Sequence, residues 1–162
     1  ARLLERASAL PHRLVLVGRE GDASPDVDRL IAELAPLAGR VLKLGARPRE
    51  ELIALYQRAA CVAVPSRYEG FGFPVLEAMA CGAPVVISNA SSLPEIAGGA
   101  ALTHDIDDEE GLSHALGRLL GEPGLATELR RKGLERAASF SWSRAAAQTL
   151  AVATATIAER KS

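Results

Sequence analysis

Short apolar runs alternate with segments of helical periodicity along almost the whole chain, and this alternation constrains the fold more than any other feature. Leu14–Val17 is a continuous apolar run that ends at Gly18, which predicts a strand buried on both faces. The next segment, 26–38, spaces its apolar residues as on one face of a helix. Because repeated strand–helix–strand units require crossover connections, the pattern predicts an α/β fold with a parallel sheet.

The same rhythm continues toward the end of the chain. We expect further strands at 41–44, 61–64, 85–87 and 100–102, and helices or helical turns at 49–60, 75–80, 94–97, 108–120, 125–139 and 142–160. No internal repeat and no linker rich in Gly, Pro or Ser divides the chain. We therefore expect one domain over residues 1–162.

Composition excludes several classes of function. The 162 residues carry a net charge of −1, from 19 basic and 20 acidic side chains, so no overall positive field attracts nucleic acid. No apolar run approaches the length of a membrane span, about 18 residues. Cys61 and Cys81 are too few for a disulfide scaffold and lack metal-ligand spacing. A reducing, cytoplasmic setting is the simple expectation.

The most informative segment is the loop 65–73, which leads directly into the helix expected at 75–80. Gly70 and Gly72 allow a ligand to approach backbone N–H groups closely. The start of the helix adds further unpaired N–H groups and a partial positive charge, a combination suited to phosphate. The glycines alone fit a plain tight turn equally well.

Two carboxylates flank this expected anion site. Glu69 lies in the loop and Glu77 about one turn inside the helix, with seven residues between them. A carboxylate repels phosphate but accepts hydrogen bonds from sugar hydroxyls. One glutamate on a ribose and one on a second sugar, with phosphates between, fits a sugar nucleotide. The alternatives are a favourable charge near a helix N-terminus for Glu77 and a solvated loop residue for Glu69.

These residues carry a resemblance to a known family. The stretch PSRYEGFGFPVLEAMACGAPVV, at 65–86, resembles the E-x7-E signature of the family 4 retaining glycosyltransferases, within glycosyl transferase group 1. Four further segments resemble family segments and follow one another in the family's order: LVLVG, LGARPREELIALYQRA, SNASSLPEIAG and SFSWSRAA. The resemblance covers nearly the whole chain. It implies the C-terminal half of a GT-B fold, a Rossmann-like parallel sheet with flanking helices that binds a nucleotide-sugar donor.

Some parts of the family pattern do not match. The family's domain begins with one more strand and an Arg…Lys pair near the diphosphate, whereas no lysine follows closely after the GRE at 18–20. We therefore expect residues 1–162 to lack that strand, the basic pair and the N-terminal acceptor-binding domain. One hypothesis is that dimerisation or strand exchange covers the open sheet edge.

The resemblance implies a role for each matching residue. Glu69, the catalytic candidate, would contact hydroxyls of the donor sugar near the reaction centre, and Glu77 would bind the ribose. The remaining donor-binding candidates are Gly70, Phe71, Gly72 and Phe73 in the loop, and Gly18, Arg19, Gly45 and Arg47 at the ends of two earlier strands. Arg19 and Arg47 fit equally well as solvated surface arginines.

The implied reaction is transfer of a hexose, of mannose or glucose type, from a UDP- or GDP-sugar to an acceptor with retention of configuration. The resemblance implies no metal or other cofactor, and we expect Asp105, Asp107 and Asp108 to cap a helix. We expect the chain alone to be inactive. The alternatives are a GT-B-like sugar-nucleotide epimerase and a non-enzymatic nucleotide-sugar binding module.

Other features have simpler interpretations. An acid–base pair of His104 and Asp105 is disfavoured, because adjacent side chains seldom face each other. The basic residues of the helix at 125–139 read as a solvated face; the alternative is peripheral contact with the inner face of the membrane, because many acceptors in the family are lipid-linked. We expect Trp142 to anchor the last helix and Ser141 to cap it.

Overall fold

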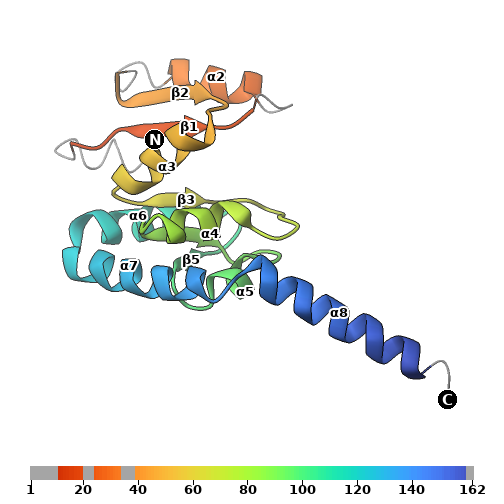
Figure 1. Cartoon of the computed structure of the whole chain (residues 1–162). Helices are drawn as coiled ribbons and strands as arrows, with labels where there is room; N and C mark the ends of the chain where they lie inside the picture. Colours follow the sequence, from red (N-terminus) through yellow and green to blue (C-terminus); the bar gives the residue numbers. More distant parts are fainter. Residues whose placement is uncertain (1–10, 20–23, 34–38, 160–162) are drawn as a thin grey trace.

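The computed structural model describes residues 11–19, 24–33 and 39–159. They form an α/β fold with parallel sheets flanked by helices (Figure 1). The elements, in order, are β1 (Leu14–Val17), α2 (Ser24–Glu33), β2 (Val41–Gly45), α3 (Arg49–Arg58), β3 (Val62–Val64), α4 (Phe73–Ala80), β4 (Val85–Ser88), α5 (Leu93–Ala97), β5 (Leu102–His104), α6 (Glu109–Gly121), α7 (Pro123–Ala138) and α8 (Trp142–Glu159). The predicted alternation is confirmed. β5 begins two residues later than expected, and residues 34–38 of the helix expected at 26–38 lie outside the described residues.

The core of the molecule surrounds the sheet formed by β3, β4 and β5, which pair in that order and all run parallel. Val85, Val86 and Ile87 of the central strand are completely buried. Because successive side chains point to opposite faces of a sheet, Val85 and Ile87 pack with α4 and α5, whereas Val86 packs with α6. Helices on both faces thus hold the carboxyl ends of these strands in place.

Helix α7 packs closely on α4, the helix that follows the glycine-rich loop. Gly133 makes this approach possible: a Cβ atom there would lie 3.1 Å from Cγ of Met79, which is itself completely buried. The first turn of α4 contains Pro74, where the missing N–H costs nothing. The start of α4 is therefore fixed both locally and by packing.

The other sheet contains β1 and β2 alone, also parallel, with Leu14 opposite Val41. The prediction that Leu14–Val17 is buried on both faces is wrong, since Leu14, Val15 and Val17 are 42%, 36% and 38% exposed. Within the described residues β1 pairs with β2 only and packs chiefly against it, so its side chains lack the double helical cover of β4. In place of the expected single sheet, the described strands form two separate sheets, one of β1 and β2 and one of β3, β4 and β5.

Helix α8 projects away from the rest of the molecule (Figure 1). Its residues are exposed from Trp142 to Ile157. Trp142 itself is 81% exposed, and the ring contact that it makes at the start of the helix is with Phe73, at a centroid distance of 6.3 Å. The cap expected at Ser141 is confirmed, because its Oγ accepts a hydrogen bond from the N–H of Arg144 at 3.2 Å.

Candidate functional site

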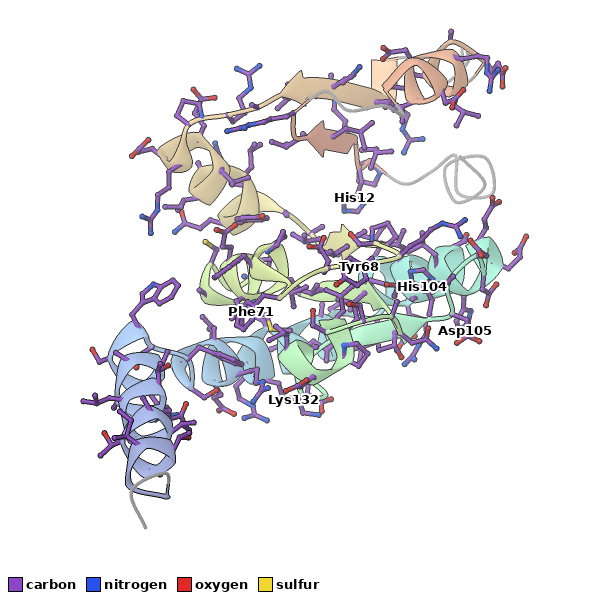
Figure 2. All side chains as sticks on the ribbon, turned by 90° about the vertical axis from the view of Figure 1, so that its right-hand side faces the viewer. His12, Tyr68, Phe71, His104, Asp105 and Lys132 are labelled. Atoms are coloured by element: carbon purple, nitrogen blue, oxygen red, sulfur yellow. The ribbon has the colours of Figure 1, made fainter. Side chains whose placement is uncertain are left out.

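The loop between β3 and α4 lies at the carboxyl edge of the three-stranded sheet, where ligands bind in open α/β folds. Tyr68 and Phe71 of this loop are labelled in Figure 2. Gly72 precedes α4 with φ +99°, and a Cβ there would lie 3.0 Å from Cδ2 of Leu93. Its backbone conformation therefore favours glycine, and a Cβ there would in addition press against Leu93.

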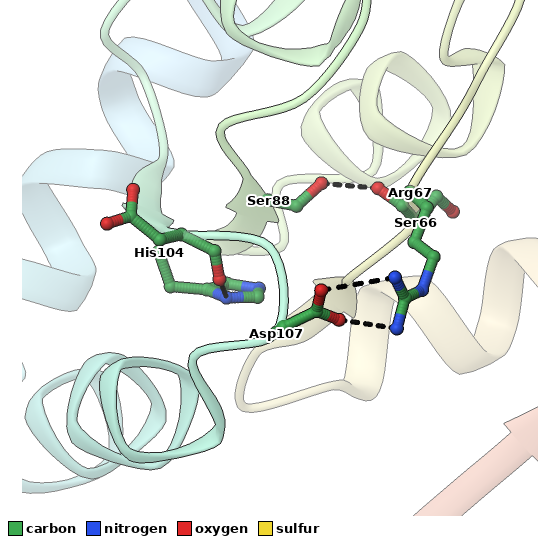
Figure 3. A network of polar contacts seen from close by, with 6 residues as sticks. Ser66, Arg67, Ser88, His104 and Asp107 are labelled. Carbon is green, nitrogen blue, oxygen red and sulfur yellow. Dashed lines mark hydrogen bonds and ion pairs between the residues drawn. The ribbon is translucent and has the colours of Figure 1, made fainter.

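Glu69 is half-buried in this loop, and its carboxylate is held in place. Its Oε1 accepts a hydrogen bond from Oγ of Ser66 at 2.9 Å. The carbonyl oxygen of Ser66 in turn accepts from Oγ of Ser88, at the end of β4, at 2.5 Å (Figure 3). The completely buried Ser88 thus connects the candidate catalytic carboxylate to the sheet.

Glu77 lies on the exposed side of α4, next to Tyr56 of α3. Burial is the main cause that raises the pKa of Tyr56 to about 12, and the Glu77 carboxylate adds to it. Burial and the same carboxylate also raise the pKa of the Cys81 thiol. The Tyr56–Glu77 contact could not be predicted, because Tyr56 shares the apolar face of its helix with leucine and isoleucine and is typical of a core residue.

The glycine-rich loop also belongs to an aromatic cluster, which we define as Phe71, Phe73, Phe140 and Trp142. The Phe71 ring centroid lies 4.8 Å from that of Phe73 and 6.1 Å from that of Phe140, and Phe73 lies 6.3 Å from Trp142. These are all the phenylalanines and the single tryptophan of the chain. Phe71 and Phe73 are 38% and 50% exposed, so the cluster borders the site as a surface.

Two serines of the loop between β4 and α5 reach the same segment. Oγ of Ser91 donates to the carbonyl oxygen of Glu69 at 2.7 Å. Oγ of Ser92 lies 3.1 Å from that oxygen and 2.9 Å from the carbonyl oxygen of Phe71. Sequence reasoning missed both residues as parts of the site, because these contacts join positions more than twenty residues apart.

The remaining donor-binding candidates lie on the two-stranded sheet. Gly18 and Gly45 meet at the ends of β1 and β2, where the Gly18 N–H donates to the Gly45 carbonyl at 3.1 Å. Arg19 is exposed. Arg47 folds back onto the Leu44 carbonyl and lies 3.7 Å from the Glu51 carboxylate. Among the described residues, no hydrogen bond or ion pair joins these four to the Glu69 loop, so the structure brings together only the candidates around α4.

The loop between β5 and α6 borders the same sheet edge. Nδ1 of the buried His104 lies 2.8 Å from the main-chain oxygen of Asp105, and the Asp105 carboxylate accepts from Asn89. The interpretation that this pair has no acid–base role stays a prediction. Asp108 caps α6 by accepting from the Gly111 N–H at 2.9 Å, which confirms one of the three expected caps. Asp107 instead pairs with Arg67 of the glycine-rich loop (Figure 3).

The hollows of the described surface and its possible metal ligands lie apart from the candidate site or are absent among the described residues. Two hollows, of about 740 and 290 Å³, lie along α6 and beside β5, and neither is lined by a residue of 65–74. Within the ranges that the structure describes, no three His, Cys, Asp or Glu side chains are grouped to hold a metal ion. The metal-independence implied by the resemblance stays a prediction. No described helix is both long and apolar enough to cross a bilayer.

Comparison with known proteins identifies the family. A family model for group 1 glycosyl transferases matches residues 1–122. The chain is 38% identical over 149 residues to O-antigen chain mannosyltransferase B of Escherichia coli, and the alignment covers 92% of this chain and 39% of that protein. It is 43% identical over 130 residues to MMP alpha-(1->4)-mannosyltransferase of Mycolicibacterium hassiacum, and that alignment covers 77% of this chain and 31% of the relative. The chain belongs to the group 1 glycosyltransferases; its finer placement in family 4 stays a prediction.

Solved structures of GT-B glycosyltransferases agree with the fold. Sucrose-phosphate synthase of Thermosynechococcus elongatus superposes with a TM-score of 0.81 and 30% identity, over 97% of this chain and 42% of that one. Anabaena HepE, solved in complex with UDP, gives a TM-score of 0.77 at 23% identity, over 96% of this chain and 44% of HepE. The chain thus spans less than half the length of the relatives it matches.

Proposed function

We propose that this chain is the donor-binding part of a retaining glycosyltransferase, which transfers a hexose from a UDP- or GDP-sugar to an acceptor. The observation that carries the proposal is the arrangement at the start of α4. A glycine-rich backbone segment lies between two carboxylates, with Glu69 anchored through Ser66 on one side and Glu77 beside Tyr56 on the other.

The chemistry of these groups suits the two halves of a nucleotide sugar. The N-terminus of α4 and the loop amides favour the diphosphate, because unpaired N–H groups and the helix dipole attract anions. Glu69 would accept hydrogen bonds from hydroxyls of the transferred sugar, and Glu77 from those of the ribose. Both carboxylates would then avoid the phosphates, whose charge they repel.

In the transfer step the bond between the sugar's anomeric carbon and the leaving phosphate oxygen breaks. A bond from an acceptor oxygen forms at the same carbon, on the same face in a retaining enzyme. The acceptor's proton leaves with the displaced phosphate or passes to solvent. Negative charge grows on the phosphate, so amides already aimed at it lower the barrier without reorganising. This chain's residues would thus mainly position the donor and stabilise the leaving group.

The relatives support the donor class. Two of them are named as mannosyltransferases, and HepE has been solved with UDP and with UDP-glucose. Because those proteins are more than twice as long as the matched part, we infer that the acceptor binds to a further domain of the full-length protein. We accordingly expect the chain of residues 1–162 to bind donor without appreciable transfer. A reaction in the cytoplasm, with soluble nucleotide sugars, is part of the same proposal.

The structure bears on two proposed partners. Of the basic residues on α7, Arg131 and Lys132 pair with Glu135 and Glu128 at 2.7 and 2.6 Å. Arg136 donates to main-chain oxygens of α5 and stacks over Phe140. Two of the four basic side chains on α7 are thus paired with carboxylates and a third is held against the protein, which favours a solvated face over contact with a membrane. A homodimer through an open sheet edge remains a hypothesis, which the mass in solution tests.

Calorimetric titration with UDP, GDP, ADP and their glucose and mannose conjugates tests the proposal. We expect UDP or GDP compounds to bind, and Glu77→Ala to weaken them by about tenfold, the effect of losing a charged acceptor. Glu128→Ala, which removes an exposed glutamate from α7, is the control and should bind like the wild type. Equal affinity in the wild type and Glu77→Ala would refute the ribose assignment. Transfer by the wild-type chain that is lost in Glu69→Ala would contradict the expected inactivity.

A further inference from the structure

The serines of the β4–α5 loop have consequences for the direction of the loop amides. Ser91 and Ser92 both direct their hydroxyls at the carbonyl oxygen of Glu69, and Ser92 also reaches that of Phe71. The described residues contain no cis peptide bond. In a trans peptide the C=O and the following N–H point in opposite directions. The N–H groups of Gly70 and Gly72 therefore point away from the serines.

These two amides have no partner inside the described part of the protein. Neither N–H donates a hydrogen bond to a backbone or side-chain acceptor there. Gly70 is exposed, whereas Gly72 is buried. A buried N–H without an acceptor is unfavourable, so an oxygen that supplied one would be stabilised at this place. Both N–H groups thus lack an acceptor among the described residues and lie in the segment directly before α4.

Ser91 holds a conformation that indicates a constraint. Its φ is +54°, in the left-handed region that residues other than glycine rarely adopt. Strained backbone of this kind persists where surrounding interactions enforce it, and it is common at functional sites. Here the 2.7 Å hydrogen bond to the Glu69 carbonyl is the interaction that the conformation makes.

We propose that Ser91 and Ser92 are positioning residues that fix the Gly70 and Gly72 amides toward the donor's phosphate. This role rests on the proposed function, because it concerns the orientation of the N–H groups that would bind the donor's phosphate. The serines touch no ligand themselves. They hold two carbonyl oxygens, and the peptide planes transmit that orientation to the N–H groups on the other side of the loop.

The double variant Ser91→Gly plus Ser92→Ala tests this proposal. Glycine adopts a positive φ without strain, so the variant removes both hydroxyls while relieving Ser91's backbone. We expect UDP to bind about tenfold more weakly, as for two lost hydrogen bonds, with an unchanged or raised melting temperature. Thr127→Val, which removes a hydroxyl bonded to a carbonyl at 2.8 Å on α7, is the control. Ser92→Thr keeps a hydroxyl and should bind like the wild type.

A second measurement separates this inference from the proposed function. In ¹⁵N-labelled protein without ligand, the Gly70 and Gly72 amide resonances should shift or broaden in the double variant and stay in place in Thr127→Val. Unmoved resonances would overturn the inference whether or not UDP binds. If the wild type binds UDP and the double variant binds it equally well, the inference is wrong and the proposed function stands. If the wild type binds no nucleotide, the proposed function fails, and the resonances still decide whether the serines orient the loop.

Discussion

The Tyr56 phenol of α3 lies beside the Glu77 carboxylate of α4, where these two helices pack together. The candidate ribose-binding residue therefore has a neighbour from a second helix. Burial, assisted by that carboxylate, raises the pKa of Tyr56 from 10.0 to about 12. The phenol is therefore protonated at neutral pH. The phenol and the exposed carboxylate therefore face each other across the contact between α3 and α4.

This relationship predicts a dependence of stability on high pH. Because the pKa of Tyr56 is higher in the folded protein than in the unfolded chain, its contribution to stability is complete below pH 10 and is lost as the pH rises toward 12. The phenolate absorbance of the wild type, compared with Tyr56→Phe, reports this titration. We expect Glu77→Gln to lower the pKa of Tyr56. A Tyr56 that ionises near pH 10 in the wild type would contradict the contact.

Gly72 is expected to be the most sensitive glycine of the loop. Gly72→Ala should lower the free energy of unfolding by about 2 kcal/mol or more, since alanine is strained at φ +99° and its Cβ would crowd Leu93. Gly124→Ala, at a helical position where a Cβ meets nothing within 4 Å, should leave stability unchanged or raise it. Urea unfolding measures both. Equal stability of the two variants would show that Gly72's conformation is not required.

Sequence patterns predicted the glycine-rich loop and α4 well, because their determinants are local. Gly72 supplies the positive φ, Pro74 fits the first turn, and the apolar residues that follow share one helix face. β5 was displaced because Ala100 and Ala101 have little preference for strand, whereas the β-branched Thr103 lies further along.

Features that depend on distant partners could not be predicted. The run Leu14–Val17 has the composition of a buried strand, but which strand pairs with it and what covers it are not encoded in the run itself. Likewise, no local pattern singles out Ser91 and Ser92, and only the fold brings their hydroxyls to the Glu69 and Phe71 carbonyls.

The cap of α6 provides a test of the neighbouring loop. Asp108→Ala should destabilise the protein by about 1 kcal/mol, because the Gly111 N–H loses its acceptor at the start of the helix. Asp108→Asn should cost far less, since asparagine is also a good N-cap. Thermal unfolding at neutral pH compares the two. If both variants unfolded at the wild-type temperature, the cap would not contribute to stability.

The most direct test of the donor site compares UDP with uridine by following the glycine amides in ¹⁵N spectra. We predict that UDP shifts the Gly70 and Gly72 resonances and that uridine, which lacks the diphosphate, does not. Glu77→Ala should reduce the response to UDP. If UDP instead shifted glycines along α6, such as Gly111 and Gly117 in the hollow there, while Gly70 and Gly72 stayed in place, the diphosphate would bind elsewhere and the assignment would be wrong.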